Sequence, residues 1–210
     1  MSTATDQLFD DGFATLPLMA ILRGFEPART VQLCERAWDL GITLVEVPVQ
    51  SDESLEALRQ AVRSGAGRGA IVGAGTVTSV QRVDVAAAAG AAFTVAPGFS
   101  GPVARASLAA GMPHLPGVAT ASEIQQAQGL GLSWLKAFPA SELGVGWFAA
   151  MRGPFPETRL VATGGMNLDN TAQFLGAGAA AVSLGSALAD EDQFAALPDL
   201  VAQLQSGGTR

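Results

Sequence analysis

The stretch LVEVPVQ, residues 44–50, alternates between two kinds of side chain. One face consists of the valines Val45, Val47 and Val49, and the other of Glu46, Pro48 and Gln50. In a parallel strand covered by helices, the apolar face packs on the helices and the opposite face points into the interior of the sheet or barrel. A buried glutamate is costly unless it is paired or used. Glu46 is therefore a candidate functional residue.

Seven other short apolar or β-branched runs resemble this one, and most of them close with Gly, Pro, Ser or Thr. The eight runs are Leu18–Gly24, Leu44–Gln50, Gly69–Thr76, Phe93–Gly98, His114–Ala119, Leu135–Pro139, Leu160–Gly165 and Ala181–Ser186. Segments rich in alanine and leucine separate them, with helical spacing of their apolar residues. Several of these segments end in a glycine suited to a left-handed helix end: Gly41, Gly90, Gly111, Gly131 and Gly178.

Eight consecutive strand–helix units predict an α/β protein built as a compact parallel (β/α)8 TIM barrel. We expect one domain over residues 1–210, with residues 1–16 forming an N-terminal helix across the base of the barrel. An open doubly wound sheet is the alternative architecture.

The composition excludes several classes of protein. Hydrophobic residues make up 49% of the chain and charged residues 15%, which supports a large core and argues against disorder. The net charge of −7, with no Lys/Arg cluster, disfavours a nucleic-acid or membrane-surface partner. No apolar stretch is long enough to cross a bilayer. Because Cys34 is the only cysteine and no signal peptide is visible, we expect a cytoplasmic protein without an internal disulfide.

Lys136 is the only lysine, since eleven of the 12 basic residues are arginine. It lies in an apolar strand segment and shares its predicted inward face with Trp134 and Phe138. A lysine that served only as a surface charge would be expected on a helix exterior, where arginines are found instead. The competing interpretation is a lysine without a chemical role, either paired with an acidic side chain or with a buried stem whose ammonium group reaches solvent.

An inward lysine beside an inward glutamate suits carbonyl chemistry. Lysine attacks a ketone as the neutral amine, and apolar surroundings favour that form over the ammonium. The resulting iminium withdraws electrons, so that a neighbouring C–C bond can break to leave an enamine. A carboxylate must move protons during dehydration of the carbinolamine and at the enamine carbon, and Glu46 is the candidate. The pair predicts an enzyme with Lys136 as nucleophile and Glu46 as acid/base.

Glycine-rich segments close the last two predicted strands. Gly164 and Gly165 follow Thr163, and Gly185 and Ser186 follow the last strand. Loops after strands seven and eight of such barrels commonly bind phosphate, because glycine lets backbone N–H groups approach an anion. Glycine also makes turns, and a purely structural role for these loops is the competing interpretation.

Two further positions are candidates for shaping a substrate pocket. Thr76 ends the third strand, where its hydroxyl could hold a substrate carboxylate or simply cap a helix. Pro97 follows the fourth strand and is expected in the pocket wall. His114 is the only histidine and we interpret it, like Cys34, as structural. A Cys/His metal site is therefore excluded, and no tight acidic motif suggests another metal.

Taken together, several segments resemble the 2-keto-3-deoxy-6-phosphogluconate (KDPG) and 4-hydroxy-2-oxoglutarate (KHG) aldolase family. They are Leu44–Val47, Gly73–Thr76, Val95–Gly98, Pro116–Thr120, Leu135–Pro139 and Thr163–Gly165. The resemblance implies a class I, metal-free and cofactor-free lyase that works as a homotrimer. It implies Lys136 as the Schiff-base lysine and Glu46 as its acid/base. It also implies a pyruvate pocket at Thr76 and Pro97, and phosphate at the glycine-rich loops.

The resemblance implies cleavage of KDPG to pyruvate and glyceraldehyde 3-phosphate, and action on 4-hydroxy-2-oxoglutarate in part of the family. Thr163 resembles the gluconate branch. Gln50 departs from the pattern, since the gluconate branch commonly carries an arginine there and the phosphogalactonate branch a shorter amide. The segment Leu16–Gly24 resembles the phosphogalactonate branch, in which Arg23 would help to bind the substrate, so the C4 epimer is a second candidate substrate. The same barrel could instead serve a phosphosugar isomerase or epimerase, or a non-catalytic metabolite sensor.

Overall fold

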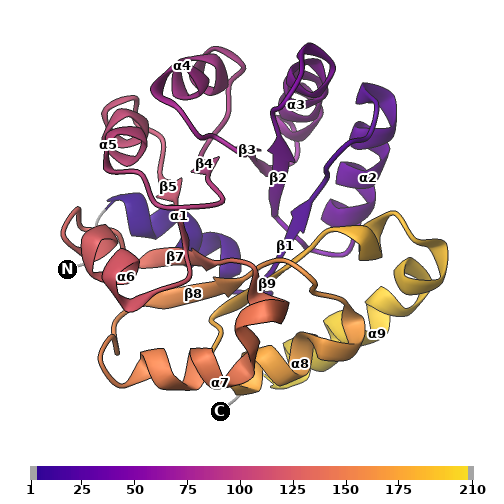
Figure 1. The fold of residues 1–210 in the computed structure, drawn as a ribbon. Coiled ribbons are helices and arrows are strands. Elements are labelled where there is room, and N and C mark those ends of the chain that lie inside the picture. Colours follow the sequence, from indigo (N-terminus) through magenta and orange to yellow (C-terminus); the bar gives the residue numbers. More distant parts are fainter. Residues whose placement is uncertain (1–3, 208–210) are drawn as a thin grey trace.

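The structure is a computed structural model, and it describes residues 4–207. Figure 1 shows parallel strands in the centre and helices around them. The strands are β1 (Leu18–Ile21), β2 (Leu44–Pro48), β3 (Ile71–Gly75), β4 (Thr94–Val95), β5 (His114–Leu115), β6 (Gly117–Val118), β7 (Trp134–Ala137), β8 (Arg159–Ala162) and β9 (Ala181–Leu184). The helices are α1 (Ala4–Phe13), α2 (Pro27–Asp39), α3 (Asp52–Gly65), α4 (Val80–Ala88), α5 (Gly101–Ala109), α6 (Ala121–Gln128), α7 (Ala140–Arg152), α8 (Leu168–Gly176), the 3-10 turn η1 (Ser186–Leu188) and α9 (Glu191–Gly207).

The sheet closes on itself through a strand that is interrupted once. The strand order is β5-β4-β3-β2-β1-β9-β8-β7-β6, with parallel pairing, so β5 and β6 lie at its two ends. Only Pro116 separates these two strands in the sequence. Proline has no backbone N–H to donate, which explains the break in what the sequence suggests is one strand. The prediction of a parallel (β/α)8 barrel with an N-terminal helix is confirmed.

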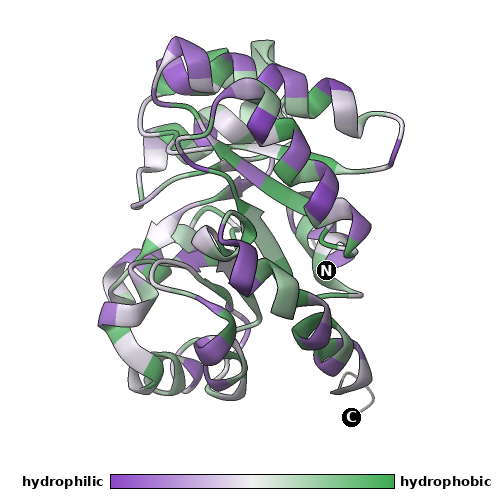
Figure 2. Ribbon diagram, turned by 90° about the vertical axis from the view of Figure 1, so that its right-hand side faces the viewer, coloured by the Kyte–Doolittle hydropathy of each residue, from purple (hydrophilic) through white to green (hydrophobic). Residues whose placement is uncertain are grey.

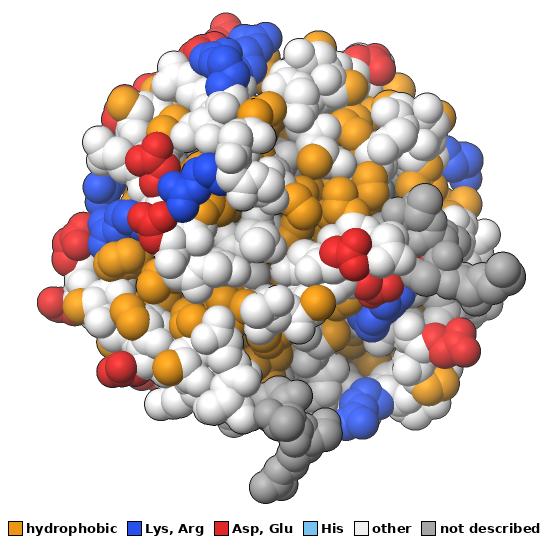
Figure 3. Space-filling model, turned by 180° about the vertical axis from the view of Figure 1, so that it is seen from behind, with side chains coloured by type: hydrophobic (Ala, Val, Ile, Leu, Met, Phe, Trp, Pro, Cys, Tyr) orange, Lys and Arg blue, Asp and Glu red, His pale blue; other side chains and the backbone are white. Residues whose placement is uncertain are grey.

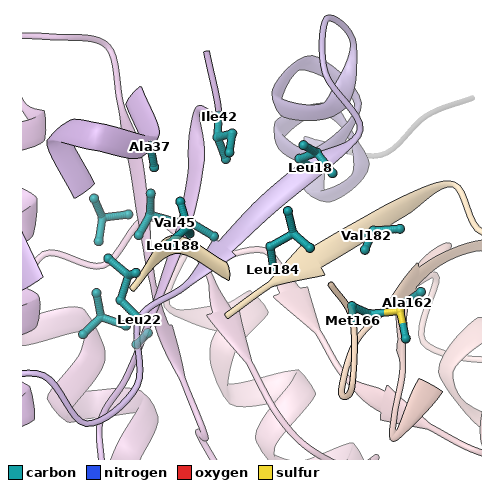
Figure 4. Packing of buried hydrophobic residues seen from close by; sticks show 14 of the residues in the cluster. Leu18, Leu22, Ala37, Ile42, Val45, Ala162, Met166, Val182, Leu184 and Leu188 are labelled. Atoms are coloured by element: carbon teal, nitrogen blue, oxygen red, sulfur yellow. The ribbon is translucent and has the colours of Figure 1, made fainter. Parts of the chain in front are cut away.

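The two faces of each strand belong to two separate hydrophobic clusters. Val45, Val47 and Val49 pack with the helices in the outer cluster, whereas Leu44 belongs to the cluster inside the barrel. Figure 4 shows the outer layer, with Leu184 of β9 close to the side chains that β1 and η1 contribute. The alternation seen in LVEVPVQ therefore gives the correct inward direction for Glu46.

Helix α1 fills the amino-terminal end of the barrel. The ring of Phe9 contacts Phe93 at a centroid distance of 5.5 Å, and Phe13 contacts Trp134 at 4.9 Å. Asp10 of α1 accepts a hydrogen bond from the indole Nε1 of Trp134 at 2.9 Å and pairs with Arg159. This closed, apolar end leaves the carboxyl ends of the strands as the open face of the barrel.

Local sequence signals account for many helix ends. The side chains of Ser51, Thr120 and Asn167 form capping boxes at the starts of α3, α6 and α8. The glycines expected to end helices all have positive φ: Gly41 (84°), Gly90 (83°), Gly111 (75°), Gly131 (76°) and Gly178 (108°). These ends place each following strand at the sheet without a strained side chain.

The surface is mixed in character. Figure 2 shows hydrophobic residues in the strands and on the inner sides of helices, with hydrophilic residues outside. Figure 3 shows acidic and basic side chains interspersed around the rear face, with hydrophobic side chains between them. Within residues 4–207, no helix combines the length and apolar character that crossing a membrane requires.

His114 lies outside the barrel interior in a buried hydroxyl cluster. Its Nδ1 lies 2.7 Å from Oγ1 of Thr94, which lies 2.6 Å from Oγ of Ser107. Nε2 is buried and has no hydrogen-bond partner among the described residues. Burial lowers the pKa of His114 to about 4. These contacts agree with a structural role.

Acidification should therefore destabilise the fold through His114. Histidine in an unfolded chain has a pKa near 6.5. Between this pH and the lower pKa of the folded protein, His114 is protonated in the unfolded chain but neutral in the folded one, so acid favours unfolding. The free energy of unfolding should fall by about 3 kcal/mol between pH 6.5 and pH 4 through this group. Urea unfolding at several pH values measures it. His114→Asn, which does not titrate, should lose this part of the pH dependence, and an unchanged slope would show that His114 is not its source.

Candidate active site

Lys136 and Glu46 meet inside the barrel. Nζ of Lys136 lies 3.5 Å from Oε2 of Glu46, and the two residues are 3% and 0% exposed. The other carboxylate oxygen, Oε1, is buried without a hydrogen-bond partner among the described residues. Nζ also lies 5.4 Å from the centroid of the Phe138 ring. The amine is thus held by one carboxylate in an otherwise apolar setting, and one carboxylate oxygen remains available.

Glycines on β3 make room for this pair. A Cβ added at Gly75 would lie 2.1 Å from Oε1 of Glu46, so any side chain there would displace the carboxylate. Gly73, two residues earlier on the same face, similarly leaves space for the ring of Phe93. Residues 73–75 therefore belong to a strand whose inward positions carry no side chain, rather than to a nucleotide-binding loop.

A cavity of about 780 Å³ opens at the carboxyl ends of β1, β7, β8 and β9. This end of a (β/α)8 barrel is where active sites are built. Seven of the residues singled out from the sequence line it: Arg23, Lys136, Thr163, Gly164, Gly165, Gly185 and Ser186. The structure thus brings the predicted amine and the predicted phosphate loops to one cavity.

Gln50 and Thr76 do not line the cavity themselves but hold a residue that does. Arg23 donates from Nη1 to Oε1 of Gln50 at 3.0 Å and from Nη2 to Oγ1 of Thr76 at 3.4 Å. Thr76 has a positive φ of 58°, an uncommon conformation for a residue with a branched side chain. The two side chains fix the guanidinium at the rim of the cavity.

Pro97 also lies outside the cavity lining. It is exposed, and its carbonyl oxygen would be 2.1 Å from a Cβ added at Gly117. The loop after β4 therefore lies directly on β6, the strand that pairs with the Lys136 strand β7. Pro97 thus lies next to the neighbouring strand of β7 but outside the residues described as lining the cavity.

The two glycine-rich loops leave neighbouring strands. Gly164 and Gly165 follow β8 with φ values of 93° and 72°, a left-handed conformation that glycine adopts without strain. Nδ2 of Asn170 donates to the carbonyl oxygen of Gly165 at 2.9 Å. Gly185 and Ser186 lead from β9 into η1. Both loops border the end of the cavity away from the barrel interior.

Several cavity-lining residues were missed in the sequence. They include Ile21, Phe25, Met166, Asn167, Ser183, Asp190 and Gln193. Ser183 carried a usable signal, because in AVSLGS it shares its face with Ala181 and Gly185. Asp190 directly precedes α9 and Gln193 lies in its first turn, where no strand pattern shows which side chains turn toward the site.

A metal centre has no support in the part of the chain that the structure describes. No group of three or more His, Cys, Asp or Glu side chains there is placed to hold a metal ion. Cys34 is buried, and burial raises the pKa of its thiol to about 12, which suits a core residue. The chemically distinctive groups of the site are thus the amine of Lys136, the Glu46 carboxylate and the Arg23 guanidinium.

Comparison with known proteins identifies the family. A family model described as KDPG and KHG aldolase matches residues 10–201. The chain belongs to this family. It is an aldolase, a carbon–carbon lyase of the class I KDPG and phosphogalactonate aldolases.

Two curated relatives and one solved structure show which proteins of this kind the chain is similar to. The 2-dehydro-3-deoxy-6-phosphogalactonate aldolase of Escherichia coli K12 is 36% identical over 82% of this chain and 84% of its own length. The 2-dehydro-3-deoxy-phosphogluconate aldolase of Treponema pallidum is 38% identical over 64% of each chain. The crystal structure of the Legionella pneumophila KDPG aldolase, with pyruvate captured at low pH as a covalent carbinolamine, has a TM-score of 0.80 and 27% identity over 99% of this chain and 98% of that one.

The Legionella structure bears directly on the chemistry of the family. A carbinolamine forms when an amine adds to a carbonyl carbon, so that enzyme binds pyruvate covalently through an amine. The aldolases of this family accordingly work through a Schiff base with pyruvate, as the resemblance implied.

Proposed function

We propose that Lys136 is the Schiff-base lysine of this aldolase and Glu46 its acid/base. The observation that carries the proposal is the contact of 3.5 Å between the only lysine of the chain, which lines the cavity, and Glu46, which is fully buried beside it and is not itself among the lining residues. No other primary amine side chain exists in the sequence to form the adduct.

The reaction can be written on these two side chains. Neutral Lys136 adds to the C2 ketone of a 2-keto-3-deoxy acid, and Glu46 protonates the departing hydroxyl, so that water leaves and an iminium forms. The C3–C4 bond breaks, its electrons pass to C3 as an enamine, and C4 becomes an aldehyde as its hydroxyl gives its proton to the Glu46 carboxylate, which is thereby protonated again. Glu46 then protonates C3, and water hydrolyses the iminium to release pyruvate and free Lys136.

The far end of the substrate suits the two glycine-rich loops. We propose that backbone N–H groups around Gly164, Gly165, Gly185 and Ser186 bind a terminal phosphate. Arg23 supplies the only guanidinium among the residues described as lining the cavity, and it is placed by Gln50 and Thr76. The substrate class is then a 6-phosphorylated 2-keto-3-deoxy hexonate, cleaved to pyruvate and glyceraldehyde 3-phosphate.

For the C4 epimer, we propose the galactonate rather than the gluconate series. The hydrogen bond from Arg23 to Gln50 supports it, because it joins Arg23, which resembles the galactonate branch, to an amide where that branch carries a shorter amide and the gluconate branch an arginine. The longer alignment with the Escherichia coli phosphogalactonate aldolase supports it as well. Thr163 favours the gluconate series, which is therefore the second candidate. Parallel assays of kcat/KM on the two epimers distinguish them.

Reductive trapping tests the Schiff base itself. The protein is incubated with pyruvate and borohydride, digested, and mapped by mass spectrometry. We expect a reduced pyruvate adduct on Lys136, because reduction converts the iminium into a stable secondary amine. The absence of an adduct after full incubation would overturn the proposal and favour an isomerase or epimerase on this barrel, which needs no covalent amine.

A further inference from the structure

Ser183 is a buried hydroxyl residue in the cavity wall. It lies on β9, is 2% exposed, and lines the same cavity as Lys136. Ala162 of β8 pairs with Val182 of β9, so the next residues, Thr163 and Ser183, are neighbours on the inward face. Their hydroxyl oxygens lie 3.1 Å apart.

The direction of this hydrogen bond decides what each hydroxyl offers to a ligand. Thr163 donates to Oγ of Ser183, with a longer contact of 3.4 Å to the carbonyl oxygen of Val161. Its own proton is thereby taken up within the protein. The proton of Ser183 has no acceptor among the described residues. Ser183 is thus the member of the pair that can donate into the cavity.

The path of the substrate passes over these two residues. Thr163 directly follows β8 and leads into Gly164 and Gly165, and Ser183 lies in β9, which Gly185 follows. In the proposed reaction C2 is bonded to Lys136 and the phosphate lies at those loops. The carbons between them, including C4 with its hydroxyl, must therefore lie beside β8 and β9. Below this level the interior faces of both strands are apolar, with Val161 and Ala181 in the inner cluster.

We propose that Ser183 is a specificity-determining residue. Its hydroxyl donates a hydrogen bond to the C4 hydroxyl of the substrate and accepts one from the Thr163 hydroxyl. The inference rests on the proposed function and deepens it. A donor at a fixed point of the wall favours the epimer whose C4 oxygen faces β9.

The experiment compares Ser183→Ala with the unaltered protein on both C4 epimers. A neutral hydrogen bond corresponds to a factor of up to about ten. We expect kcat/KM for the preferred epimer to fall about tenfold and that for the other to change less than about twofold. Ser107→Ala is the matched control, because Ser107 is also a buried serine bonded to a threonine but is remote from the cavity. Its epimer ratio should stay unchanged.

A double-mutant cycle with Thr163→Val tests the coupling. If Ser183 controls the Thr163 hydroxyl, the effects of the two substitutions on the epimer ratio should not be additive. An epimer ratio that is unchanged in Ser183→Ala, while pyruvate is trapped on Lys136 at the normal rate, would overturn this inference alone. Failure to trap pyruvate in the unaltered protein would instead overturn the proposed function.

Discussion

Replacement of Lys136 by methionine should lower kcat/KM for aldol cleavage by at least about four orders of magnitude. Methionine fills nearly the same space but has no amine, so neither carbinolamine nor iminium can form. The remaining groups of the cavity can bind substrate but offer no electron sink for the C3–C4 bond. Steady-state cleavage assays measure the loss, and borohydride trapping with pyruvate should yield no adduct. A variant that kept even a hundredth of the activity would show that Lys136 is not the nucleophile.

The same substitution has a separate effect on stability. Lys136→Met leaves Glu46 fully buried without its only hydrogen-bonding partner among the described residues. Removing one partner of a buried pair costs about 3–5 kcal/mol. The double variant Lys136→Met/Glu46→Gln removes the buried charge and should recover most of that loss, measured by urea unfolding, while remaining inactive. This second protein separates the loss of chemistry from the loss of folded enzyme.

The fold could be predicted because the signals were local and repeated. The alternation of valine with Glu46, Pro48 and Gln50 gave the inward face directly, and the two hydrophobic clusters show the same division. Eight strand runs and the glycine helix ends then specified the barrel. The interruption at Pro116 was not predicted, since a proline inside a short apolar run indicates a weak point but does not fix where pairing stops.

The site was predictable to the extent that it lies on strands. Lys136, Thr163 and the glycine-rich loops could be placed because an inward position on a strand, or the residue after it, reaches the cavity. The contacts of Arg23 with Gln50 and Thr76 depend on the path of three separate loops, which no local pattern encodes.

The position of α9 beside the cavity likewise depends on how segments far apart in the sequence are brought together. Asp190 and Gln193 line the cavity because η1 turns the chain back over it. The proximity of Lys136 to Glu46, 90 residues away in the sequence, also needed the closed barrel. Their common inward direction was predictable, whereas the distance of 3.5 Å was not.

Replacement of Glu46 by glutamine should lower kcat by about two to four orders of magnitude, because general acid–base catalysis commonly contributes this much. The substitution keeps the shape of the side chain and the space left by Gly75, so substrate should still bind. It removes the group that protonates the leaving hydroxyl and the enamine carbon. Pyruvate should therefore still be trapped on Lys136, although slowly, since formation of the iminium has lost its acid but retains its amine.

A second readout isolates the proton transfer at carbon. The unaltered protein should exchange the methyl protons of pyruvate with deuterium from solvent, because enamine and iminium interconvert through the C3 proton. In the Glu46→Gln variant the exchange rate should fall by a factor similar to that for kcat. Glu53 is an exposed glutamate on α3, and the control variant Glu53→Gln should exchange pyruvate protons at the normal rate. If exchange persists at the full rate while cleavage is lost, another group moves the proton at C3, and Glu46 acts only on the carbinolamine. If both persist, Glu46 has no part in catalysis, and its burial beside Lys136 is purely structural.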